Sequence, residues 1–106
     1  MFSKKEKKQL VNSFDLLHQV ILKNEPNPLD EMLSLADLLT EGRGVLALFS
    51  ELHNVETANH ILAFLSGVVY ALNGSVYQIS KETFLFASEE ALKDGSLDEY
   101  IKEIGE

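Results

Sequence analysis

The sequence predicts an α/β fold of the α+β kind, a two-layer sandwich with helices packed on a small mixed sheet in the order β-α-β-α-β-β-α. Two observations lead to this fold class. Apolar runs of strand length alternate with segments of helical period, and two later strand-like runs are joined by a short polar turn. With 106 residues, 45% of them hydrophobic, the chain can form one domain with its own core.

The first predicted element is a strand over about residues 16–23, where apolar and β-branched residues are dense. It stops before Pro26 and Pro28, which fit neither a helix interior nor a strand ladder. A helix is the alternative, because apolar residues from Leu10 to Ile21 also match a helical seam. Residues 1–13 are interpreted as a basic lead-in, frayed or helical, and residues 14–106 as the core domain.

A helix over residues 28–41 follows, with Pro28 at its start, two acidic residues in its first turn and Gly42 at its end. Residues 45–49 are then apolar without interruption, which is typical of a central strand covered on at least one face. Strand, helix and strand form a βαβ unit with short connections.

The next helix, over about residues 54–72, is expected to be capped by Asn54 and ended by Asn73-Gly74. Between residues 61 and 72 it is apolar nearly all round, and one small domain has too little material to cover such a helix.

A strip of small side chains on this helix would let another backbone come close. We expect a homodimer contact there, or a contact in a polymer, because a helix-to-helix contact is the simplest way to cover the helix. The predicted self-association residues are Ala63, Gly67, Tyr70 and Ala71.

A β-hairpin is predicted after Gly74, with strands at residues 75–79 and 83–87 and a turn at residues 80–82. Ser88 is expected to cap a last helix, which Gly95 interrupts before the helical period resumes.

Charge is distributed unevenly along the chain. Residues 1–8 hold four lysines and one glutamate, so the net charge of −8 divides into +3 there and −11 in the rest. An acidic body repels phosphate backbones, which argues against nucleic acid and favours a cationic protein or peptide partner. The basic tip could make weak, peripheral contact with an anionic membrane.

No enzyme, cofactor or metal site is expected. The absence of cysteine removes thiolate chemistry and suits a cytoplasmic protein, and no converging set of nucleophile, base and orienting group is recognisable. His53, Glu56 and His60 have a spacing that zinc ligands can have, but no fourth ligand is evident. Solvated helix polarity explains them better.

Residues 64–76 read Phe-Leu-Ser-Gly-Val-Val-Tyr-Ala-Leu-Asn-Gly-Ser-Val, and Gln78-Ile79 and Phe84-Leu85 follow. This pattern resembles the core of the SepF family, cell-division proteins that tether FtsZ filaments to the membrane, and the resemblance covers roughly residues 16–92. It implies a dimer that can associate further and that holds the C-terminal peptide of FtsZ in a hydrophobic groove of the second helix and the hairpin.

The residues expected to contact this partner peptide are His60, Phe64, Val76, Gln78, Phe84 and Phe86. Phe84 and Phe86 point to one side of their strand, so a place in the core is the alternative for both.

The chain departs from the family pattern at polar positions. His60 and Ala63 stand where an Arg and an Asp are usual, and an apolar residue replaces an Asn near the end of the second strand. Residues 1–13 make a poor amphipathic helix, and the family's long acidic linker is missing.

The function predicted on these grounds is that of a non-enzymatic division adaptor, cytoplasmic and peripheral at the membrane of the division site. A self-assembling scaffold that binds no FtsZ is the alternative.

Overall fold

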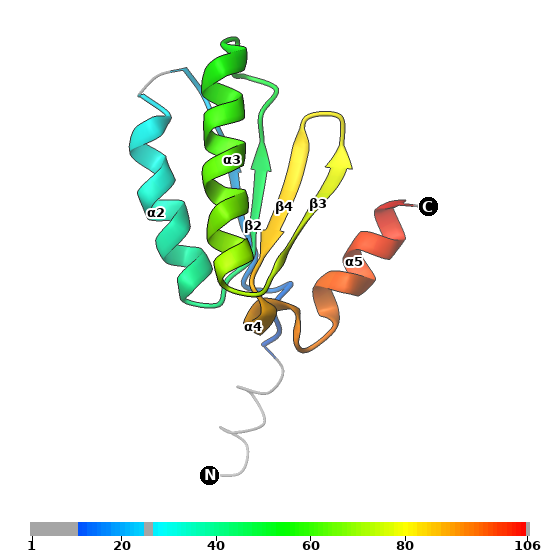
Figure 1. The fold of residues 1–106 in the computed structure, drawn as a ribbon. Coiled ribbons are helices and arrows are strands. Elements are labelled where there is room, and N and C mark those ends of the chain that lie inside the picture. The colour runs from blue at the N-terminus through cyan, green and yellow to red at the C-terminus, as the bar shows by residue number, and fades with distance from the viewer. Residues whose placement is uncertain (1–10, 25–26, 106) are drawn as a thin grey trace.

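The computed structural model describes residues 11–24 and 27–105, and it has the predicted α+β architecture of a mixed sheet with helices (Figure 1). The predicted element order is confirmed, and the interruption at Gly95 divides the last helix in two. The elements are β1 (His18–Ile21), α2 (Leu29–Thr40), β2 (Val45–Leu48), α3 (Val55–Ala71), β3 (Ser75–Ser80), β4 (Thr83–Ala87), α4 (Glu89–Leu92) and α5 (Ser96–Gly105).

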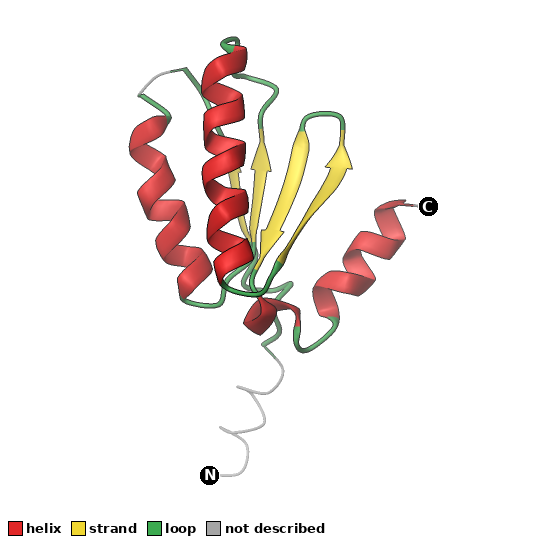
Figure 2. Cartoon of the chain, in the orientation of Figure 1, coloured by secondary structure: helices red, strands yellow, loops and turns green. Residues whose placement is uncertain are grey.

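The four strands lie in the order β1-β2-β4-β3 (Figure 2). β1 is parallel to β2, as the βαβ unit requires, and β4 pairs antiparallel with both β2 and β3. Val45 is opposite His18 on one side and Phe86 on the other, which sets the register of the three strands. β2 and β4 are therefore the inner strands, and β1 and β3 form the two edges.

The first predicted strand is confirmed and the helical alternative is wrong, although β1 is shorter than expected. Residues 13–16 form a turn in which the amide of Leu17 donates to the carbonyl of Phe14, at 3.1 Å. The predicted lead-in falls largely on residues 1–10, outside the described residues. Asn12 and Ser13 lie against the folded body, because their turn is bonded to the start of α5.

The helix ends follow the predicted capping chemistry. The side chain of Asn54 accepts from the amide of Thr57 at 3.1 Å, and that of Ser88 accepts from the amide of Ala91 at 3.2 Å. Gly42, with φ of 90°, ends α2 in the left-handed conformation that favours glycine. α2 and α3 lie side by side over one face of the sheet (Figure 1).

The main core lies between this face of the sheet and the two helices. It holds side chains from every layer: Leu22, Leu35, Leu39, Val45, Ala47, Phe49, Ile61, Leu65, Val69 and Phe86. Ala87 follows Phe86 on β4 and so points to the opposite face, where it forms a smaller cluster with Ala91 and Leu97. Leu97 belongs to α5, which packs against β3.

The connection from α3 to β3 requires glycine at position 74. Asn73 adopts φ of 57°, and the amide of Gly74 donates to the carbonyl of Val69 at 2.7 Å. A Cβ atom at Gly74 would overlap the carbonyl oxygen of Ala87 and lie 2.7 Å from the Cα atom of Ser88. The turn can therefore be this tight only without a side chain.

Gly74→Ala should lower the free energy of unfolding by about 2 kcal/mol or more, because the backbone of β4 must shift to make room. Gly67→Ala is the matched control. Gly67 lies within a helix and no atom of the chain is within 4 Å of the added Cβ, so at protein concentrations too low for self-association the change should raise the free energy of unfolding by up to about 1 kcal/mol. Urea unfolding followed by circular dichroism measures both. Equal stability of the two variants would contradict this account of the turn.

Asp94 holds the first described residues to the start of α5. Its carboxylate accepts from the amides of Ser96, at 3.0 Å, and Ser13, at 2.8 Å. These hydrogen bonds, that from the Ser96 backbone above all, lower the pKa of Asp94 below its usual range, against the opposing effect of slight burial.

Because the pKa of Asp94 is lower in the folded state, its contribution to stability is present above about pH 4 and is lost as the pH falls further. Asp94→Ala should lower the free energy of unfolding at pH 7 by at most about 1 kcal/mol, since the site is exposed. The difference from the unmodified protein should shrink at pH 3. Urea titrations at both pH values test this, with Asp37→Ala, an exposed aspartate of α2, as control.

Candidate interaction surface

One face of α3 points away from the domain. Its buried side consists of Ile61, Leu65 and Val69, which recur every four residues against the sheet. The four residues predicted for self-association lie on the outward side, and all are exposed: Ala63, Gly67, Tyr70 and Ala71. The tertiary fold thus leaves uncovered the strip for which the sequence predicted a helix contact.

Two features of this strip suit a close contact. Gly67 has no atom within 4 Å of the place where a Cβ would stand, so nothing in this chain covers the helix backbone there. Tyr70, one turn along, is 84% exposed, and a large aromatic ring is a common anchor of protein interfaces. Self-association through the strip remains a prediction.

The residues predicted to contact a peptide come mostly from one side of the sheet. Val76 is opposite Phe86 and Gln78 is opposite Phe84, so all four share the face on which α3 lies. α3 contacts both strands of the hairpin. We call the part of this face that reaches the surface the α3–hairpin surface; it comprises His60, Phe64, Val76, Gln78 and Phe84.

The apolar members of the α3–hairpin surface are half-buried. Phe64, Val76 and Phe84 pack against the main core and keep part of their side chains exposed. Phe84 also meets Phe49 edge-on, with ring centroids 5.5 Å apart. Such residues combine a fixed position with some accessible apolar area, which is what an anchor site for a short peptide requires.

Phe86 is different, because it has no exposed area and lies within the core. It can pack beside Val76, its neighbour on β3, but cannot touch a peptide while the domain is folded. We therefore leave Phe86 out of the surface.

The two polar members of the surface are exposed. His60 precedes Phe64 by one helical turn, and so the two side chains are neighbours on α3. The side chain of Gln78 donates to the carbonyl of Lys81 at 3.2 Å, which ties it to the hairpin turn. Both positions can change without disturbing the core.

The sequence left open whether both faces of the sheet are covered. Leu46 is opposite Leu85, both are buried, and Ile21 at the β1 edge is 46% exposed. The uninterrupted apolar run over residues 45–49 was the available signal, because a strand with one solvated face alternates instead.

In residues 11–24 and 27–105, no group of three or more histidine or acidic side chains is arranged to hold a metal ion. Over the same ranges, no helix combines the length and the apolar character that crossing a bilayer demands.

Comparison with known families identifies the relatives of this chain. The family model described as "Cell division protein SepF" matches residues 21–91, which contain the whole of α3 and the hairpin. The chain belongs to the SepF family. This confirms the resemblance seen in the sequence to a family described as cell division proteins.

Individual SepF proteins agree with the family match. The chain is 29% identical over 101 residues to cell division protein SepF of Clostridioides difficile, covering 95% of this chain and 66% of the relative. It is 33% identical over 76 residues to that of Carboxydothermus hydrogenoformans, covering 72% and 55%. Over 63 residues it is 40% identical to that of Heliobacterium modesticaldum, covering 59% and 38%. The chain thus spans only part of the length of these SepF proteins.

Proposed function

We propose that this SepF chain is a non-enzymatic adaptor of cell division that associates with itself through α3 and binds the C-terminal peptide of FtsZ on the α3–hairpin surface. The observation that supports this most is the uncovered face of α3. A strip of small residues around Gly67 adjoins the half-buried Phe64 on one helix, so the two contacts would be neighbours.

The energetics of Gly67 support a contact outside the single chain. A glycine within a helix is less stable than alanine by about 1 kcal/mol. Nothing in the chain needs the missing Cβ, because the space around it is open. A close approach of a second helix would make use of it.

Charge supports a partner with some basic character. Residues 9–106 carry a net charge of −11, so a peptide with lysine or arginine beside apolar anchors would be attracted and oriented. We also propose that residues 1–8, with a net charge of +3, give the cytoplasmic protein weak peripheral contact with anionic lipid at the division site.

Gly67→Lys should break self-association and leave the chain folded. The lysine is free to extend into solvent in one chain, whereas between two helices it would be a bulky, unpaired charge that costs several kcal/mol. Light scattering at micromolar concentration should give at least twice 11.9 kDa for the unmodified protein and less for the variant. The control is Ser34→Lys, at an exposed position of α2. A mass near 11.9 kDa before mutation would contradict the proposal.

Phe64→Ala should weaken binding of a fluorescent FtsZ C-terminal peptide at least about tenfold, or 1.4 kcal/mol, because it removes an apolar anchor. Leu52→Ala is the matched control, since Leu52 is also half-buried against the main core but lies outside the α3–hairpin surface. Both variants should lose some stability, and only the first should lose affinity. Fluorescence anisotropy measures binding.

If the unmodified protein bound no peptide and still assembled, the scaffold alternative would replace the adaptor. Equal loss of affinity in both variants would place the binding site elsewhere.

A further inference from the structure

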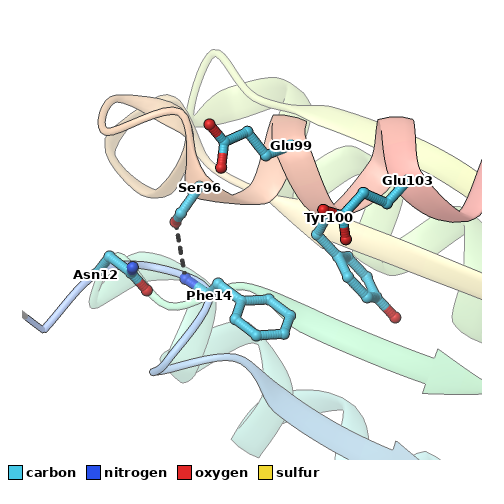
Figure 3. A pocket seen from close by; sticks show the side chains of 6 residues that line it. All are labelled: Asn12, Phe14, Ser96, Glu99, Tyr100 and Glu103. Atoms are coloured by element: carbon cyan, nitrogen blue, oxygen red, sulfur yellow. Dashed lines mark hydrogen bonds between the residues drawn. The ribbon is translucent and has the colours of Figure 1, made fainter.

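A small groove lies between the first described turn and α5, outside the residues that the SepF model matches. Its walls are the turn residues Asn12 and Phe14 and one face of α5, which contributes Ser96, Glu99, Tyr100 and Glu103 (Figure 3). The four helix positions fall at intervals of three and four, so they share one face of α5.

The groove is open and held in place. The rings of Phe14 and Tyr100 lean on each other with centroids 5.0 Å apart, yet Phe14 remains 43% exposed. The amide of Phe14 donates to the hydroxyl of Ser96 at 2.9 Å (Figure 3). The amide of Ser13 donates to the carboxylate of Asp94 at 2.8 Å. The turn therefore cannot move far from α5 without losing these bonds.

Size and chemistry indicate what the groove can hold. Its volume is about 220 Å³, below the roughly 300–1,000 Å³ of small-molecule pockets, so it suits a side chain better than a free ligand. Two aromatic rings, in a groove that Glu99 and Glu103 also line, suit a lysine, because its methylene stem can pack on a ring while its ammonium reaches a carboxylate.

The chain itself supplies lysines at this point. Residues 1–10 join the body at Val11, next to the wall residue Asn12, and they contain four lysines, at positions 4, 5, 7 and 8. Fully extended, ten residues span roughly 33–36 Å, more than the approximately 15 Å length of α5. A segment tethered so closely has an effective concentration on the order of millimolar, so weak contacts suffice to hold it.

We infer that residues 1–10 dock on this face of α5, with a lysine of the basic run seated between the aromatic rings and the two glutamates. Charge complementarity supports this occupant. Residues 1–10 have a net charge of +3, and they join the chain beside the face of α5 that carries Glu99 and Glu103 one turn apart. Docking relieves the repulsion between Glu99 and Glu103, which like charges at this spacing create.

A spin label at Ser3→Cys tests the docking, and the label is unique because the chain has no cysteine. In the full chain at low salt, the label should reduce the amide signals of residues 100–104 at least twofold relative to those of α2. The signals should recover near 1 M salt, where the Debye length is about 3 Å.

Charge reversal shows whether the glutamates of the groove are responsible. Glu99→Lys with Glu103→Lys should abolish the signal loss. The control is Asp37→Lys with Glu41→Lys, which changes the net charge equally at two exposed positions with the same spacing, one in α2 and one at its C-cap, and it should leave the signal loss intact.

Reversing the four lysines to glutamate should also abolish the signal loss, and combining both reversals should restore it. Rescue cannot come from a general effect on folding or net charge.

A mixing experiment separates docking within one chain from docking between copies. One protein carries the spin label at natural isotope abundance, and the other is isotope-labelled and carries no spin label. Within one chain, the mixture shows no signal loss. Signal loss in the mixture would assign the groove to the segment of a second copy and overturn the proposal. It is also overturned if residues 100–104 keep full intensity at low salt, or if the groove reversal has no effect.

Discussion

The covering of strand β2 on both faces is the constraint from which the rest of the structure follows. Val45 and Ala47 have no exposed area on the face toward α2 and α3, and Leu46 retains only 7% on the other face. A strand of this kind must lie inside a sheet, and it lies between β1 and β4. Since β1 is parallel to β2, the chain between them must cross over the sheet, and α2 does so while covering its apolar face.

α3 packs one of its sides on the sheet that contains β2, and its opposite side remains exposed. α2 and α3 together satisfy one face of the sheet, and no further element of the described residues lies on the outward side of α3. Ala63 and Gly67 are therefore at the surface although the helix as a whole has the composition of a buried one. The same helix can thus stabilise its own domain with one side and offer the other to a partner, because these two tasks use different residues.

Charges of opposite sign are separated along the chain, and those of the described residues lie outside the hydrophobic core. The acidic residues of this SepF chain lie mostly at helix starts and on exposed faces, where they stabilise the helix dipole or remain solvated. The resulting negative body and the basic residues 1–8 have opposite signs within one chain. Such a division favours contacts between the tip and the body, and between the body and cationic partners, and salt weakens both.

The local features of the fold were determined by the sequence. Apolar periods, the caps at Asn54 and Ser88, and the stop at Gly42 depend on neighbours a few residues away, so they placed the elements in the correct order. The limits of β1 were less exact, because its start is set by a turn that is bonded to Ser96, far along the chain.

Exposure was decided only by the tertiary structure. Phe84 and Phe86 are two positions apart on β4 and point to the same face of the sheet. Only the packing of the folded domain leaves Phe84 half-exposed and buries Phe86. The meeting of Phe14 with Tyr100 likewise needs the folded sheet, because 85 positions of chain separate them and no local pattern encodes such a contact. Sequence patterns show which residues are apolar, and the tertiary structure determines which of these become buried.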